Sequence, residues 1–311
     1  KDHRKLHRAP ELVLSDRVQH LYPGMVANVV ERMFRVDNPN PKPGVRRILT
    51  LAGYEIRLGA PGPEDAVAVW GKSPTAPRGE AVAEHLGRAV VHVEDAFLRS
   101  VRTGRQGDAP LGLLIDHGGV HFASGQPSDL ERLLARHPLD DTALLDRARI
   151  GMARLRAAHL SKYNACDPDL PAPAPGYVLV IDQTKGDASI REGGASAATL
   201  REMLFVAQDE NPGARIVIRT HPESDAGQRP GHFGPEDATD RISLCTAAIS
   251  PHRLLEGAVA VYTVSSQLGL EAILAGHRPR VLGQPFYAGW GLTDDSHPIA
   301  RRQRKLTRAQ L

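Results

Sequence analysis

The C-terminal half of the chain alternates short apolar runs with segments of helical spacing. Five runs are rich in Val, Ile and Leu and end in polar or turn-forming residues: 177–183, 214–221, 241–246, 258–264 and 278–283. Apolar runs of this length, separated by helical segments, are typical of buried strands in a parallel sheet with covering helices. This half is therefore predicted to form one Rossmann-like domain.

The first half shows the same alternation. Its apolar runs, read as strands, cover 45–54, 65–71, 88–95 and 111–117, and a long amphipathic helix is predicted over 140–160. Residues 1–26 look helical but are interrupted by prolines, and the proline-rich stretch 38–44 breaks any regular element.

A segment rich in Pro and Ala, 166–176, separates the two halves and reads as a linker. We predict an α/β fold of two Rossmann-like domains, 1–165 and 177–311, facing each other across a cleft. This is the GT-B arrangement of many glycosyltransferases. The alternative is a single doubly wound domain with a long N-terminal elaboration.

Composition narrows the class of protein. A chain of 311 residues is long enough to form two domains. Its net charge of +3 does not indicate nucleic-acid binding, but it is compatible with an anionic substrate or an anionic membrane surface. Two distant cysteines, Cys166 and Cys245, are read as free thiols in a reducing compartment. No signal peptide or membrane-spanning run is visible, and the ends suggest a piece of a longer protein. We expect a cytoplasmic location.

Polar residues gather where the predicted strands end, which is the edge at which open α/β sheets bind ligands. Ser265 and Ser266 separate a strand from a helix, so their hydroxyls and the free N–H groups of the helix N-terminus suit a phosphate. Serine is also a favoured helix N-cap, and that is the structural alternative. His221 follows another strand of the same domain and favours the phosphate interpretation.

Seven motifs resemble the capsule-polysaccharide retaining β-Kdo glycosyltransferases of the KpsC type, in the order of that family. They are VWGKSP, EDAFLRSV, LSKYN, VLVIDQTKGDASI, THPES, VSSQLGLEAILAG and GQPFYAGWGLTDD. Together they cover about residues 68–308. Ala96 stands where the family has glycine, and Glu223 where it has aspartate. Members often carry two such modules, so the resemblance implies one module of a longer chain.

The resemblance implies transfer of Kdo from CMP-β-Kdo to a Kdo-containing glycolipid at the inner face of the cytoplasmic membrane, beside other capsule biosynthesis proteins. It places the catalytic aspartate at Asp187, where Gly186 gives the loop room to approach a ligand. Retention by double displacement needs a second carboxylate as acid/base. Glu94 is predicted for that role and Asp95 is its competitor, since adjacent strand residues face opposite ways. Asp182 is predicted to brace the loop through backbone N–H groups.

The donor and the sugar carry negative charge, so further binding residues are expected. Predicted donor contacts, besides His221 and the two serines, are Gln183, Lys185 and Glu271, the last toward ribose hydroxyls. Predicted substrate contacts are Arg99, Lys162, Tyr287 and Trp290, the aromatic pair forming a wall for the sugar or packing between the domains. No metal and no other cofactor are expected, because a donor with one phosphate has no pyrophosphate to neutralise.

Two other functions stay open from the sequence. A transferase for CMP-sialic acid would use the same His and Ser pattern. An inert nucleotide-sugar-binding module is the third possibility, although the presence of both Asp187 and Glu94 argues against it.

Overall fold

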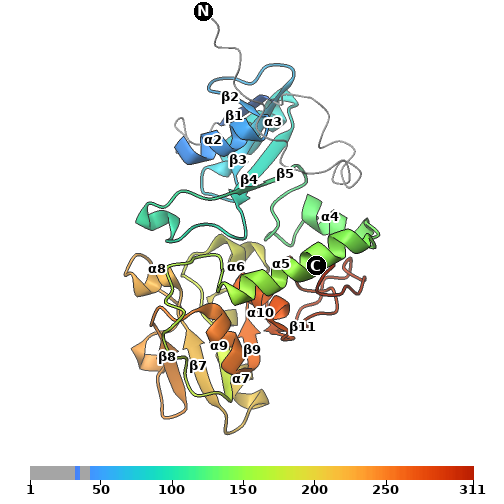
Figure 1. The fold of residues 1–311 in the computed structure, drawn as a ribbon. Helices are drawn as coiled ribbons and strands as arrows, with labels where there is room; N and C mark the ends of the chain where they lie inside the picture. Colours follow the sequence, from blue (N-terminus) through green and yellow to red (C-terminus); the bar gives the residue numbers. More distant parts are fainter. Residues whose placement is uncertain (1–31, 36–42) are drawn as a thin grey trace, which may run out of the picture.

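The computed structural model describes residues 32–35 and 43–311, which form two lobes (Figure 1). The predicted helical opening 1–26 lies outside this range. Within the described residues, the N-terminal lobe contains five strands: β1 (Arg32–Arg35), β2 (Glu55–Arg57), β3 (Asp65–Trp70), β4 (Val90–Asp95) and β5 (Leu113–Asp116). Their order in the sheet is β2-β1-β3-β4-β5. β1 to β4 run parallel, but β5 pairs with β4 in the antiparallel sense, where the sequence predicted only parallel strands.

The predicted strand 45–54 is wrong, because this run forms helix α2 (Pro43–Leu51). Val45 and Leu49 lie one helical turn apart and are both buried against the sheet. Proline is tolerated in the first turn, and Gly53 takes a positive φ of 94° just after the helix ends. The remaining helices of this half of the chain are α3 (Ala76–Leu86), the short η1 (Gly104–Gln106), α4 (Asp129–Arg136) and α5 (Thr142–Ala157).

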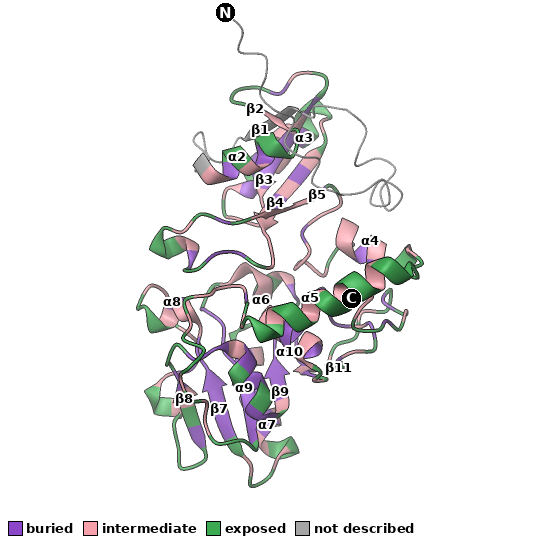
Figure 2. Ribbon diagram, in the orientation of Figure 1, coloured by how far each residue is buried: buried purple, intermediate pink, exposed green. Residues whose placement is uncertain are grey.

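The C-terminal lobe is built on a six-stranded parallel sheet. Its strands are β6 (Tyr177–Ile181), β7 (Arg215–Arg219), β8 (Ile242–Cys245), β9 (Ala258–Thr263), β10 (Arg280–Val281) and β11 (Asp294–Asp295). Read from β8, the order is β8-β7-β6-β9-β10-β11, which is the 3-2-1-4-5-6 order of the Rossmann fold. All five residues of β6 are buried, as expected for a central strand covered on both faces, and its neighbours β7 and β9 are largely buried too (Figure 2).

Helices cover both faces of this sheet, and the sheet separates two hydrophobic clusters. They are α6 (Ala188–Glu192), α7 (Ala197–Glu210), α8 (Pro222–Asp225), η2 (Pro235–Asp237), α9 (Pro251–Gly257) and α10 (Leu268–Ala275). The two lobes with their facing sheets have the GT-B arrangement, which confirms the predicted fold class.

The segment that follows β5 leaves the N-terminal sheet. Although it falls within the predicted first domain, α4 packs Leu134 against Trp290 and Leu306, and Glu131 accepts hydrogen bonds from Arg301 and Arg302. Helix α5 crosses in front of the C-terminal lobe (Figure 1) and packs against α10. Within the described residues, no helix has both the length and the apolar character that crossing a membrane requires.

Candidate active site in the interlobe cleft

A cleft of about 1170 Å³ lies between the lobes and takes its lining from both. The C-terminal lobe contributes the carboxyl ends of β6, β7 and β9. After β6 the chain continues to β7 on one side of the sheet, whereas after β9 it continues to β10 on the other side. The carboxyl ends of the neighbouring strands β6 and β9 therefore form the switch point at which such sheets bind ligands. The predicted residues that line the cleft are Glu94, Lys162, Gln183, Asp187, His221, Ser265, Ser266 and Glu271.

Gln183 and Ser265 are joined at the switch point by a side-chain network. The Gln183 Oε1 accepts from the Ser265 backbone N–H at 2.9 Å, and its Nε2 donates to the Ser265 hydroxyl at 3.0 Å. Ser189, in α6, completes the network at 3.2 Å from both. These contacts fix the turn after β9 to the loop after β6, so Gln183 orients Ser265 from within the protein.

Ser266 follows in the same turn. Its hydroxyl accepts from the Leu268 N–H at 3.3 Å and so supports the first turn of α10, but the N-cap position itself is held by Gln267, so neither serine is the N-cap. Its carbonyl accepts from the Tyr287 hydroxyl at 2.6 Å. Both serines thus lie immediately before the N-terminus of α10 and line the cleft there.

His221 ends the loop after β7 and begins α8. Its Nδ1 accepts from the Glu223 N–H at 3.1 Å, so the proton of the neutral ring sits on Nε2. Burial lowers the pKa of His221 to about 4, with Lys162 adding to the effect. The ring also meets Tyr163 edge-on with centroids 6.0 Å apart. The cleft therefore holds a neutral, oriented imidazole with an N–H donor.

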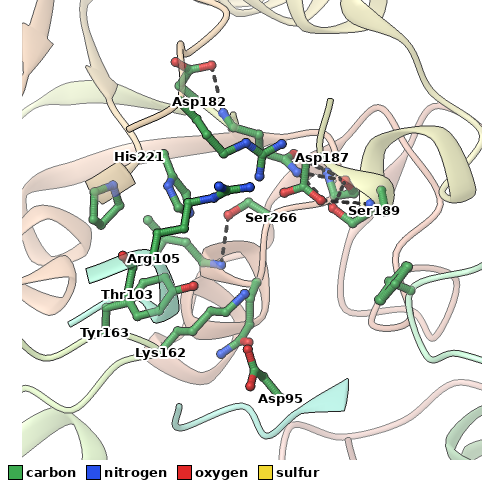
Figure 3. Close-up of a pocket in the computed structure, with 18 of the residues that line it drawn as sticks. Asp95, Thr103, Arg105, Lys162, Tyr163, Asp182, Asp187, Ser189, His221 and Ser266 are labelled. Carbon is green, nitrogen blue, oxygen red and sulfur yellow. Dashed lines mark hydrogen bonds between the residues drawn. The ribbon is translucent and has the colours of Figure 1, made fainter. Parts of the chain in front are cut away.

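The two aspartates of the loop after β6 have different surroundings. Asp182 is buried and accepts from the backbone N–H groups of Gln183, His232 and Phe233, which is the bracing role expected from the sequence. Asp187 is half-buried and lines the cleft, and its Oδ1 accepts from the Ser189 N–H at 2.9 Å. Gly186, at φ 75°, provides the turn that presents Asp187 to the cleft (Figure 3).

Glu94 faces the cleft from the end of β4 in the other lobe. Burial, reinforced by the charge of Asp95, raises the pKa of Glu94 to about 7. The backbone of Gly71 lies directly beside this carboxylate: a Cβ at that position would sit 1.8 Å from Glu94 Oε1. Asp95 lines the cleft as well, so the prediction that only one of the two faces it is wrong. Asp95 is held by Arg99 at 2.6 Å, which favours Glu94 over its competitor as the acid/base.

Lys162 stands between the carboxylates of the two lobes. Although burial opposes it, the charges of Tyr163, Asp187, Asp95 and Glu94 raise the pKa of Lys162. The backbone of Lys162 joins the lobes as well, because its carbonyl accepts from the Arg99 N–H and its N–H donates to Glu271. Lys162 is thus a fixed positive charge at the centre of the cleft.

Glu271 has a different setting from the one expected. It is buried, and both carboxylate oxygens accept from the Ser161 hydroxyl, at 3.0 and 2.8 Å. Burial raises the pKa of Glu271 to about 7. In this structure Glu271 holds the LSKYN segment in place instead of presenting free oxygens for a ribose.

Four predicted contacts do not line the cleft. The Arg99 guanidinium is buried and donates hydrogen bonds to Asp95, Ser100 and the Asp108 carbonyl, while Lys185 is exposed to solvent. Tyr287 and Trp290 are fully buried, so they pack in the core and form no sugar wall. Their neighbour Phe286 does line the cleft.

Other lining residues were not predicted from the sequence. Phe286 stacks on Phe97 of the other lobe with centroids 5.0 Å apart, beside His121, whose pKa burial lowers to about 3. Arg105 and Arg229 bring guanidinium groups to the cleft from opposite lobes. Residues 32–35 and 43–311 contain no group of three or more His, Cys, Asp or Glu side chains placed to hold a metal ion.

A family model for capsule polysaccharide biosynthesis proteins matches residues 65–170 and 154–311. The chain belongs to this family. Two curated relatives are the capsule polysaccharide modification protein LipA of Neisseria meningitidis serogroup B and the lipopolysaccharide-processing protein LpsZ of Rhizobium meliloti. LipA is 36% identical over 86% of the chain and LpsZ 39% over 68%. The chain spans 40% of the LipA sequence and 50% of LpsZ.

Solved structures agree with the family assignment. The β-Kdo 2,4-transferase of Thermosulfurimonas dismutans KpsC is 35% identical, with a TM-score of 0.82 over 89% of this chain and 88% of that one. The β-Kdo 2,7-transferase of the same KpsC, 24% identical with a TM-score of 0.66, shares the fold. The resemblance drawn from the seven motifs is therefore confirmed for this capsule family member.

Proposed function

We propose that this chain is a retaining β-Kdo glycosyltransferase of capsular polysaccharide biosynthesis. Kdo is an eight-carbon 2-ulosonic acid, and the proposed donor is CMP-β-Kdo. The observation that carries the proposal is the arrangement of the cleft: two carboxylates, Asp187 and Glu94, face it from opposite lobes beside the switch point of the C-terminal sheet. The similarity to a β-Kdo transferase structure supports the same conclusion.

The donor is proposed to bind the C-terminal lobe, with its phosphate against His221, Ser265 and Ser266. A neutral imidazole with its proton on Nε2 donates one hydrogen bond to the phosphate, and the N-terminal end of α10 adds a favourable dipole. A single phosphate held by such donors needs no metal ion, and we propose none.

Transfer is proposed to proceed by two displacements at the anomeric carbon C2. First, the Asp187 carboxylate attacks C2, a C2–O bond to Asp187 forms, and the C2–O bond to the phosphate breaks, so CMP leaves with the bonding electrons. Next, an acceptor hydroxyl attacks C2 while Glu94 takes its proton, and the bond to Asp187 breaks and restores the carboxylate. Two inversions give net retention.

The electrostatics of the cleft suit these roles. A general base works best when its pKa lies near the working pH, and that of Glu94 lies at about 7. Lys162 adds a positive charge near the attacking carboxylate, since the charge of Asp187 is among those that raise the pKa of Lys162.

The acceptor is proposed to be a Kdo-containing glycolipid that enters from the N-terminal lobe. The chain would then work at the inner face of the cytoplasmic membrane, together with other capsule biosynthesis proteins. A CMP-sialic acid transferase and an inert binding module are the alternatives. The cleft-facing positions of both Asp187 and Glu94 favour an active enzyme over the inert module.

The direct test is incubation with CMP-Kdo, generated in situ, and a Kdo-terminated acceptor. The proposal predicts CMP release and a product whose NMR spectrum shows a new β-Kdo linkage. Transfer from CMP-sialic acid alone would favour the sialyltransferase, and CMP binding without release from either donor would favour the inert module.

A further inference from the structure

Two arginines of the cleft lining, one from each lobe, lie beside the same buried carboxylate. The Arg105 Nε lies 3.4 Å from Glu223 Oε2, and the Arg229 Nη1 lies 3.6 Å from the same oxygen. Glu223 is buried in α8, two residues after His221, so both guanidinium groups are gathered beside the proposed phosphate site. Figure 3 shows the Arg105 side chain pointing into the cleft toward the space between His221 and Asp187.

The loop that carries Arg105 is built to reach across the cleft. Thr103 is fully buried, and its hydroxyl lies 3.3 Å from Gln228 Oε1 of the C-terminal lobe. Gln106 accepts from the Thr103 N–H at 3.1 Å and closes the short helix η1. These contacts hold the backbone of Arg105 against the C-terminal lobe, while its side chain keeps 58% of its surface exposed in the cleft.

Arg229 is fixed more firmly than Arg105. Its Nη2 donates to the Lys185 carbonyl at 2.8 Å, and it keeps 24% of its side-chain surface exposed. Among the described residues, Glu223 is the ion-pair partner that the structure shows for Arg105. A guanidinium has five N–H donors, so Arg105 can bind a planar anion while its Nε still faces Glu223.

We propose that Arg105, supported by Glu223 and Arg229, binds the carboxylate that the donor sugar carries on its anomeric carbon. This inference rests on the proposed function. In a 2-ulosonic acid the carboxylate, the leaving phosphate and the site of attack share one carbon, C2. The carboxylate must therefore lie next to both the phosphate site at His221 and the attacking Asp187, which is where Arg105 points.

The charges also require a cation at this position. Attack by Asp187 brings one carboxylate toward a carbon that carries another, and two like charges at such a distance repel. Lys162 already faces Glu94, Asp95 and Asp187. Arg105 adds a second positive charge on the donor side, and its planar fork matches a carboxylate better than an ammonium does. It would also make the site selective for acidic sugars.

The test compares Arg105→Gln and Arg105→Lys with Arg149→Gln. Arg149 is a matched control, because it is also 58% exposed and paired with a carboxylate, but it lies on α5 outside the cleft lining. Two quantities are measured for each variant: the affinity for CMP by calorimetry, and kcat/KM for CMP-Kdo. CMP carries the phosphate but lacks the sugar carboxylate, so comparing the two measurements distinguishes a loss of phosphate binding from a loss of carboxylate binding.

Arg105→Gln should lower kcat/KM for CMP-Kdo by roughly 10- to 150-fold, the range for losing a hydrogen bond to a charged group. Its CMP affinity should stay within about twofold of the wild type, Arg105→Lys should be intermediate, and Arg149→Gln should match the wild type. An equal loss of CMP affinity would assign Arg105 to the phosphate and overturn the proposal, as would an unchanged kcat/KM. If the wild type releases no CMP from CMP-Kdo, the proposed function fails and this inference with it.

Discussion

Replacing Glu94 with glutamine should make the protein more stable at alkaline pH while abolishing transfer. In the folded chain the pKa of Glu94 is raised from 4.5 to about 7, chiefly by burial and next by the charge of Asp95. At about 1.4 kcal/mol per pKa unit, keeping this side chain ionised costs the folded state roughly 3 kcal/mol. Because Glu94 retains some contact with solvent in the cleft, this value is an upper bound.

The sign of the effect follows from proton binding. Between pH 4.5 and 7 the folded state binds more protons at Glu94 than the unfolded state does, so this residue makes stability fall as pH rises. Above pH 7 the folded state bears the full free-energy cost of keeping Glu94 ionised, and below pH 4.5 this cost vanishes. Glutamine carries no charge at any pH, so Glu94→Gln should gain most at pH 8 and little at pH 5.

Urea unfolding followed by tryptophan fluorescence measures this difference, because Trp70 lies in β3, next to β4. The matched control is Glu80→Gln, since hydrogen bonds and charge from Lys72 lower the pKa of Glu80 despite the opposing effect of burial. Glu80→Gln should therefore be no more stable than the wild type at pH 8. The reasoning is refuted if Glu94→Gln is no more stable than the wild type at pH 8, or if its gain is the same at pH 5.

Three further predictions concern the cleft. His221→Ala should weaken CMP binding by about 1.5–3 kcal/mol in calorimetry, the range for a hydrogen bond to a charged group, and unchanged affinity would remove His221 from the phosphate site. The rate of transfer to the acceptor should rise about tenfold per pH unit below pH 7 and level off above it, because Glu94 must be ionised to act as the base. A transfer rate that does not change between pH 5 and pH 7 would exclude Glu94 from this role. Gly71→Ala should lower kcat at least tenfold without changing CMP affinity, because its Cβ would displace the Glu94 carboxylate; wild-type turnover in this variant would contradict the geometry.

The sequence predicted the C-terminal lobe well because its strands are buried on both faces. Such strands read as continuous apolar runs, and β6 to β9 all fall within the predicted ranges. The run 45–54 was assigned to a strand because it is short and apolar, yet its apolar residues also fit one face of a helix. Periodicity alone does not separate these cases when a run is this short.

The site was predictable where it depends on strand ends. His221, Ser265, Asp187 and Glu94 all reach the cleft, since parallel strands end at one edge of each sheet. Arg105 was missed because it lies in a loop without periodic pattern and reaches the cleft only through the packing of the two lobes.

The aromatic residues of the GQPFYAGWGLTDD motif show a second limit. Phe286 lines the cleft, whereas Trp290, four residues later, is buried against α4 and the C-terminal segment. Burial of this kind depends on elements far away in the chain, so the local sequence does not distinguish a core aromatic from a binding one.

The central claim is that Asp187 forms a covalent bond to the sugar. Intact-protein mass spectrometry of Glu94→Gln with CMP-Kdo tests it most directly, because this variant can still expel CMP but cannot activate the acceptor. The account predicts a protein carrying one Kdo residue, with peptide mapping that places it on Asp187. An adduct on Asp182, or full transfer activity in Asp187→Ala, would contradict it.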